Sequence, residues 1–169
     1  MNSFKTTFLF LALTVLIPLK SFSKSYMKLG TIYMAENTGS GSTSRLWLDI
    51  GGGYLNPQGW NLGFLYSTEK SNYAGGSSVD RSSYGPTLGW STTKDTGPYL
   101  LATYYLSSSK TNNSKGNGYQ IDGGYKFALE KVSLALQLSQ KHFKYDDQNG
   151  FAGYTEDRID PYFVVWVEF

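Results

Sequence analysis

Few residues in this chain are able to do catalytic or metal chemistry. It has one histidine, His142, and no cysteine, which excludes a thiolate metal site and disfavours a classical zinc site. His142 could be combined with Asp146 or Asp147 and a loop serine into a nucleophilic triad, but spacing alone does not supply the geometry that a triad needs. We therefore interpret His142 as a histidine at an exposed strand end, and we predict no enzyme activity, no cofactor and no metal site.

A second candidate is the acidic run at residues 144–158. Its charged residues are Lys144, Asp146, Asp147, Glu156, Asp157 and Arg158. Carboxylates at this density could bind a divalent cation, although such a run is more often a solvated loop. The sequence leaves both interpretations open.

The first 23 residues have the order of a secretory signal peptide. A basic residue precedes an apolar run at residues 8–17, a proline interrupts the run, and Ser21 and Ser23 offer small side chains at the cleavage positions. The apolar run is shorter than the about 20 residues that a membrane-spanning helix needs. We predict cleavage after Ser23, which leaves residues 24–169 as one domain.

The exported part of the chain is neutral and has the composition of a β protein. Lys5 and Lys20 account for the net charge of +2, so residues 24–169 carry equal numbers of acidic and basic groups. Phosphate binding needs a clustered basic surface, and we therefore predict no nucleic-acid partner. The many glycine, serine, threonine and tyrosine residues favour strands over helices.

Two kinds of side chain alternate along six segments, as in a strand with two different faces. Leu46 and Leu48, for example, alternate with Trp47 and Asp49. One face carries bulky apolar residues without charge, and the other face carries mostly small or polar residues. The six segments are 45–54, 60–67, 83–91, 119–127, 132–139 and 162–169. Two further segments, 26–34 and 99–107, have strand composition without a clear phase, which gives eight strands.

The charge-free apolar face is suited to lipid. A soluble eight-stranded barrel places its large apolar side chains inside, but here the opposite face is too rich in small residues to fill a dry core. Aromatic residues such as Tyr54, Trp60 and Trp90 fall near strand ends, where membrane barrels have interfacial girdles. A β-sandwich would instead need two apolar faces that pack on each other. We predict an all-β chain that forms an eight-stranded antiparallel transmembrane up-and-down β-barrel.

The connections between these strands alternate in length. Long connections are predicted at 35–43, 68–82, 108–117 and 144–158, and short ones at 56–59, 92–97 and around Glu130. Long external loops and short periplasmic turns are typical of outer-membrane barrels, which predicts periplasmic termini.

Two positions disturb the strand pattern. Pro86 lies inside a strand of a closed barrel, which predicts a β-bulge. His142 and Phe143 break the phase of their strand, which predicts that the strand leaves the membrane there.

The signal peptide, the eight alternating segments and the loop pattern resemble the small outer-membrane β-barrel proteins of Gram-negative bacteria, the class of the OmpA transmembrane domain and OmpX. The last residues resemble the C-terminal signal read by the barrel assembly machinery, through Phe163, Val165, Val167 and Phe169. The resemblance covers residues 24–169. It implies a monomer in the cell outer membrane, in contact with its lipid and lipopolysaccharide and bound during biogenesis by the assembly machinery and periplasmic chaperones.

The lumen of an eight-stranded barrel is only wide enough for its own side chains. The polar face predicts that the inward-facing residues include Lys28, Arg45, Asp49, Asp122, Lys126 and Glu168, together with Gln120, Gln137 and Trp166. Buried charges must pair or stay hydrated, so we expect a salt-bridged plug. We also predict that Lys28 pairs with Glu168, because the first and last strands must be neighbours.

These expectations favour a structural or surface-interaction role in adhesion or envelope integrity. The alternative is a porin-like narrow channel for small solutes, which needs a hydrated or movable plug. A lipid-active enzyme is a third class. Outer-membrane lipid A deacylases carry a serine two residues after the histidine, whereas His142 is followed by Phe143 and Lys144. Barrel acyltransferases carry an amphipathic N-terminal helix, whereas strand-like sequence begins here close to the cleavage site.

Overall fold

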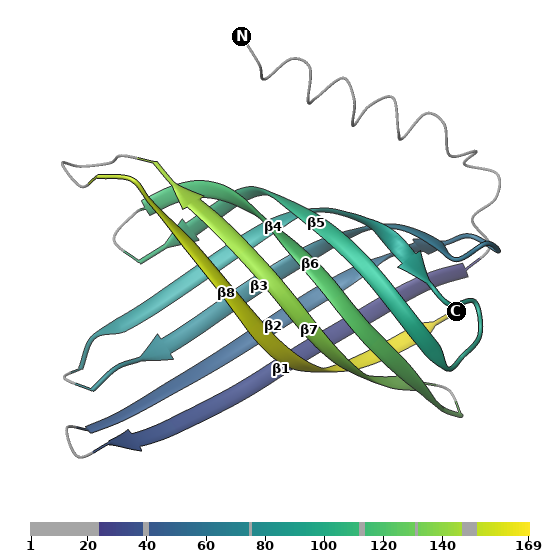
Figure 1. Ribbon diagram of the computed structural model, residues 1–169, viewed down its shortest axis with the longest axis horizontal. Helices are drawn as coiled ribbons and strands as arrows, with labels where there is room; N and C mark the ends of the chain where they lie inside the picture. Colours follow the sequence, from purple (N-terminus) through teal and green to yellow (C-terminus); the bar gives the residue numbers. More distant parts are fainter. Residues whose placement is uncertain (1–23, 39–40, 75, 112–113, 131, 147–151) are drawn as a thin grey trace, which may run out of the picture.

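The strands of this chain close into a barrel in which each strand pairs with its neighbours in sequence and β1 pairs with β8. The computed structural model describes residues 24–38, 41–74, 76–111, 114–130, 132–146 and 152–169. The strands are β1 (Lys24–Thr38), β2 (Gly41–Leu55), β3 (Trp60–Asn72), β4 (Ser78–Ser91), β5 (Gly97–Lys110), β6 (Ser114–Leu129), β7 (Val132–Tyr145) and β8 (Tyr154–Glu168) (Figure 1). The predicted eight-stranded antiparallel barrel is confirmed. The predicted signal peptide, residues 1–23, lies outside the described residues.

Across the described segments, no helix has the length and apolarity needed to cross a membrane.

The strands are longer than the sequence pattern predicted. They contain 13 to 16 residues each, and β3 and β4 together cover most of the predicted loop 68–82. The prediction of long external loops is therefore wrong for the described residues. The prediction identified strands by an apolar outward face. These strands continue above the apolar belt, where the outward side chains are polar but the backbone ladder continues unchanged.

Side chains alternate strictly between the two faces along β7. Ala135, Gln137, Ser139 and Lys141 are buried, and the residues between them are exposed or partly exposed. Phe143 continues the buried series at 1% exposure. The predicted break of phase at His142 and Phe143 is therefore wrong, because a large aromatic residue occupies an inward position where a polar one was expected.

The bulge predicted at Pro86 is confirmed. The β4–β5 register shifts between Tyr84 and Thr87, and the β5–β6 register shifts between Tyr105 and Ser108. In both ladders the extra residue belongs to β5. The strand next to Pro86 therefore accommodates the missing N–H group, while β4 itself stays paired with β3.

A tight turn joins β2 to β3, as predicted. The Asn56 side-chain oxygen accepts hydrogen bonds from the backbone N–H groups of Gln58 at 3.0 Å and Trp60 at 2.8 Å. Gly59 closes the turn with φ of 92°, in the region that favours glycine. This turn lies at the same end of the barrel as the start of β1 and the end of β8, where Ser25 and Phe169 are hydrogen-bonded.

Candidate functional site

The candidate site is the lumen, where inward side chains of all eight strands meet. Every second residue of a strand faces inward, so the small residues at these positions leave room for long charged ones. A Cβ at Gly51, for example, would lie 3.0 Å from Cγ of Lys28. The charged and polar residues buried here form three layers along the barrel axis.

The central layer is built on two buried ion pairs. Nζ of Lys28 lies 2.6 Å from Oδ2 of Asp122, and Nζ of Lys141 lies 3.3 Å from Oδ1 of Asp49. All four side chains are at most 2% exposed. Gln120 joins the pairs, because its amide donates to Asp122 at 2.6 Å and to Asp49 at 2.9 Å. The layer has equal numbers of cations and anions, so its net charge is zero.

Neutral polar side chains complete this layer. Lys141 also donates to the hydroxyl oxygens of Tyr162 at 2.6 Å and Ser67 at 3.2 Å. The Tyr99 hydroxyl donates to Gln137 at 3.0 Å, and the Tyr105 hydroxyl donates to Gln120. The buried charges are thus hydrogen-bonded from several directions, as ions in a low dielectric require.

The outer layer contains a network of five charged side chains, in which three cations contact Glu69 and Glu156. Arg81 contacts Glu69 at 3.2 Å and Glu156 at 2.6 Å, and Arg158 contacts Glu69 at 2.7 Å. Lys110 adds a contact to Glu156 at 3.0 Å. The guanidinium of Arg81 also lies over the ring of Phe143, 4.2 Å from its centroid.

One further carboxylate, Asp160, completes the outer layer. Arg158 Nε lies 2.9 Å from Asp160 Oδ2, which balances the three cations of the layer with three anions. Charge balance in each layer removes the net electrostatic potential that would attract an ion into the lumen.

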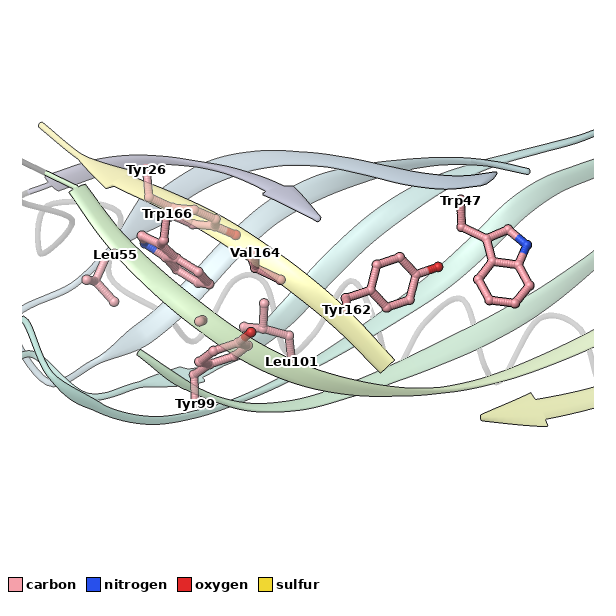
Figure 2. Packing of buried hydrophobic residues seen from close by; sticks show 9 residues of the cluster. Tyr26, Trp47, Leu55, Tyr99, Leu101, Tyr162, Val164 and Trp166 are labelled. Atoms are coloured by element: carbon pink, nitrogen blue, oxygen red, sulfur yellow. The ribbon is translucent and has the colours of Figure 1, made fainter. Parts of the chain in front are cut away.

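The third layer, at the end of the barrel where Ser25 meets Phe169, is mostly aromatic. The Trp166 ring stacks on Tyr26 with centroids 4.9 Å apart and tilts against Tyr99 at 5.2 Å. Figure 2 shows these three rings grouped with Leu55, Leu101 and Val164, and Tyr162 and Trp47 farther along the lumen. Below the rings, Lys126 lies 2.7 Å from Glu168 and 5.0 Å from the centroid of Trp166. This cluster forms an apolar septum between this end of the barrel and the central layer.

The predicted pair between Lys28 and Glu168 does not form. In the β1–β8 register Lys28 lies opposite Trp166, and Glu168 lies opposite Tyr26. Glu168 therefore lies nearer the end of the barrel where Ser25 meets Phe169, and it pairs with Lys126 and, at 3.3 Å, with Lys24. The Lys28 side chain extends across the lumen to β6.

The other predicted inward residues divide between the layers and the rim. Asp49 and Asp122 lie in the central layer, and Lys126 and Glu168 lie in the third, mostly aromatic layer. Arg45 does not join them, because it lies near the outer end of β2 and its guanidinium stacks over Tyr73, 5.5 Å from the ring centroid.

Sequence reasoning missed seven of the charged residues in the central and outer layers. They lie in predicted loops or at strand ends outside the membrane pattern, and they are Glu69, Arg81, Lys110, Lys141, Glu156, Arg158 and Asp160. The signal that could have identified them is the alternation itself. Arg81 continues the inward series of Ser83, and Arg158 continues that of Asp160, once the strands are allowed to extend beyond the apolar belt.

The outward face of the barrel is an apolar belt. The exposed side chains include Leu29 on β1, Ile50 on β2, Phe64 on β3 and Leu136 on β7. The residues assigned to the assembly signal share this face, with Phe163 at 68% exposure and Phe169 at 65%. The aromatic residues expected in the interfacial girdles are likewise exposed: Tyr54, Trp60, Tyr66, Tyr84, Trp90, Tyr119, Phe127, Phe163 and Phe169.

His142 lies on the outward face, near the external rim. Its Nδ1 lies 2.6 Å from Oδ1 of Asp157, and its ring stacks on Tyr119 with centroids 5.0 Å apart. Asp146 is exposed, and Asp147 lies outside the described residues. Among the residues with described positions, no group of three or more His, Asp or Glu side chains is placed to hold a metal ion.

Comparison with known proteins identifies a structural likeness. No protein-family model and no curated protein sequence matches the chain. Among solved structures, it is similar to the outer membrane protein AlkL, determined by solid-state NMR in DMPC lipid bilayers, with a TM-score of 0.48 and 12% identity over 88% of this chain and 90% of AlkL. The closed eight-stranded barrel with an apolar exterior and a charged interior is the architecture of small outer-membrane barrels. The chain has that fold.

Proposed function

We propose that this protein is an integral outer-membrane barrel with a closed lumen, which acts at the cell surface in adhesion or envelope integrity. The observation that carries the proposal is the charge-balanced central layer, in which Lys28, Asp122, Lys141 and Asp49 are almost completely buried and paired. A conducting pore needs hydrated polar groups along its whole length, whereas these groups are satisfied by one another.

The proposal includes export with cleavage after Ser23, a periplasmic position for both termini, and a monomer surrounded by lipid and lipopolysaccharide. Two features support it: the hydrogen bonds between Ser25 and Phe169 place both ends of the described barrel at one rim, and the exposed apolar belt suits a lipid environment. The assembly machinery and periplasmic chaperones are then the partners in biogenesis.

Two measurements test this function. In a membrane fraction, the folded barrel should migrate differently on a gel before and after boiling, and it should separate with the outer membrane. In a planar lipid bilayer, the purified barrel should give no stable conductance steps. Soluble protein without a gel shift would refute the membrane assignment, and regular conductance steps would replace the closed barrel with the narrow-channel alternative.

The enzyme alternative has its own test. The outward His142 and Asp157 pair lies at the rim, so a lipid-active barrel should turn over lipid A or phospholipid and lose that activity in His142→Ala. We expect no turnover by the unaltered protein.

A further inference from the structure

The seam between β1 and β8 is only partly closed. Its ladder contains six residue pairs, from Tyr26–Glu168 to Thr31–Phe163, whereas the β1–β2 ladder contains fifteen. Both strands continue beyond the last pair, β1 as far as Thr38 and β8 from Tyr154. Figure 1 shows the two strands diverging toward their external ends.

Pro161 lies where the ladder stops. Ser25 and Phe169 exchange two backbone hydrogen bonds, of 2.7 and 2.9 Å. Such pairs recur at every second residue of an antiparallel ladder, so the N–H groups of β8 that face β1 belong to residues 167, 165, 163 and then 161. Proline has no N–H group. The donor is therefore missing at the position that would lie opposite Tyr33, directly beyond the last pairs.

Among the described residues, no strand pairs with the β1 edge beyond Thr31, which leaves this part of the backbone edge free. By the same phase, the N–H and C=O groups of Tyr33, Ala35 and Asn37 face the gap, whereas those of Met34 and Glu36 face β2. Met34 is on the inward phase of β1 and is nevertheless 40% exposed, as expected where a neighbouring strand is absent. The N–H and C=O groups at three alternate positions make this edge receptive to another strand.

The facing edge of β8 is less receptive. Pro161 removes one donor from it, and Asp157, whose backbone also faces the gap, carries a charge and contacts His142 through its side chain. Proline and charged residues are the usual protection of a strand edge against pairing. Of the two edges, β1 is therefore the better docking surface.

The split opens near the upper boundary of the apolar belt, and outward apolar residues continue as far as Tyr33 on β1 and Ile159 on β8. The outward apolar series of β7 ends at Leu138, which pairs with Pro161, and the next outward residue is Gln140. An open sheet edge is not tolerated in hydrocarbon. The free edge of β1 therefore rises into the headgroup region and the external medium, where it is accessible from outside.

We propose that the free edge of β1, residues 32–37, docks an extended peptide segment of a partner protein, which adds as a strand antiparallel to β1. Backbone N–H and C=O groups at every second residue are complementary to another extended backbone. Tyr33 and Met34 favour apolar residues at the membrane end of that segment, and the exposed Glu36 favours a basic residue at its outer end. The inference rests on the proposed surface-interaction role and names the kind of partner.

Backbone amide exchange tests this inference on the full barrel in lipid nanodiscs. The probe is a synthetic peptide with an N-terminal lysine followed by alternating threonine and valine. Without peptide, the amides of Tyr33, Ala35 and Asn37 should exchange fast, and those of Met34 and Glu36 should exchange slowly. With peptide, exchange of the three odd-numbered amides should slow by about tenfold or more, a change that takes only about 1.4 kcal/mol.

Two proline variants distinguish the edges. Ala35→Pro removes the middle donor of the β1 edge without affecting a donor to β2, and it should abolish protection by the peptide. Thr155→Pro is the matched control, because its N–H group faces the gap from β8, and it should leave protection unchanged. Proline favours an extended residue before it, so both changes suit a strand.

The outcomes separate this inference from the proposed function. The docking edge would be overturned if the amides of Tyr33, Ala35 and Asn37 already exchanged slowly without peptide. It would also be overturned if the peptide protected the Ala35→Pro variant as well as the unaltered protein. Protection that increases with protein concentration in the absence of peptide would overturn the foreign partner in favour of a second copy. In each case the gel shift and the outer-membrane fractionation would still report separately on the barrel.

Discussion

The buried pair of Lys28 and Asp122 should dominate the stability of the barrel centre. The two side chains are 2% and 1% exposed, and their charged atoms lie 2.6 Å apart. Lys28→Met leaves the Asp122 carboxylate with the amide of Gln120 as a donor but without its ion-pair partner. Removing one member of a buried pair costs about 3–5 kcal/mol, a large share of the about 5–15 kcal/mol that stabilises a typical domain.

A double variant separates the value of the pair from the cost of an isolated charge. Lys28→Met with Asp122→Leu removes both ions, and the Gln120 amide keeps its bond to Asp49 at 2.9 Å. Because apolar replacement of a whole buried pair is often neutral, the double variant should recover most of the stability lost by Lys28→Met.

The assay is urea unfolding of the barrel in lipid vesicles, followed by the folded band on an unboiled gel. The matched control is Lys24→Met, which breaks a pair with Glu168 at 3.3 Å in which Lys24 is 47% exposed. This change should cost at most about 1 kcal/mol. Equal costs for Lys24→Met and Lys28→Met, or a double variant less stable than Lys28→Met, would refute the reasoning.

Three further predictions use the same vesicle system. Gly124→Val should lower stability by about 1–3 kcal/mol, because a Cβ there would overlap the Tyr99 ring, whereas a Cβ at Gly123 meets nothing within 4 Å and Gly123→Ala should have little effect on urea unfolding. Pro161→Thr should supply the missing donor, and the new amide at position 161 should exchange slowly because it pairs with β1, whereas fast exchange of this amide would contradict the seam argument. Burial acts to raise the pKa of Glu156, but Arg81 and Lys110 outweigh it and hold the pKa below its ordinary value of 4.5. Its stabilisation should be complete above pH 4.5 and be lost as the pH falls through the lower folded-state pKa, which amide exchange at the outer end of β8 should detect.

The number and faces of the strands could be predicted from sequence because lipid imposes a strict requirement on one face. Leu46 and Leu48 face outward and Trp47 and Asp49 face inward, as their alternation predicts. Above the belt the outward face is no longer consistently apolar, so the pattern no longer distinguishes a strand from a loop. The outer ends of the strands were missed for that reason.

The partners inside the lumen could not be predicted from alternation. Alternation predicts which residues face inward, but it does not predict how far each side chain extends across the lumen or which strand it contacts. Lys28 has Trp166 as its neighbour across the seam and pairs instead with Asp122 on β6. Such a contact depends on strand tilt and on the space left by glycines such as Gly51, and neither quantity is encoded in the period of two.

Pro86 in β4 and Pro161 in β8 show why a missing donor can have different consequences. The bond between the Thr92 N–H and the Pro98 carbonyl, at 2.9 Å, places the even-numbered residues of β4, including Pro86, toward β5. Beyond the bulge the two strands pair again, because Ser83 and Ser108 are hydrogen-bonded at 2.8 Å and backbone pairing continues above them. Beyond Pro161, the described residues of β1 and β8 have no such side-chain bond.

The connections between the strands also help to explain why β4 and β5 pair again beyond Pro86, whereas β1 and β8 do not pair beyond Pro161. A short turn joins β4 to β5, and the β5–β6 ladder holds the outer half of β5 in position, so the chain recovers register after the bulge at little entropic cost. The seam joins the two ends of the barrel strand order and has no covalent turn at its external end. A single missing donor at position 161 is therefore enough to leave the β1 edge free, and restoring that donor should lengthen the ladder from its existing end, pair by pair.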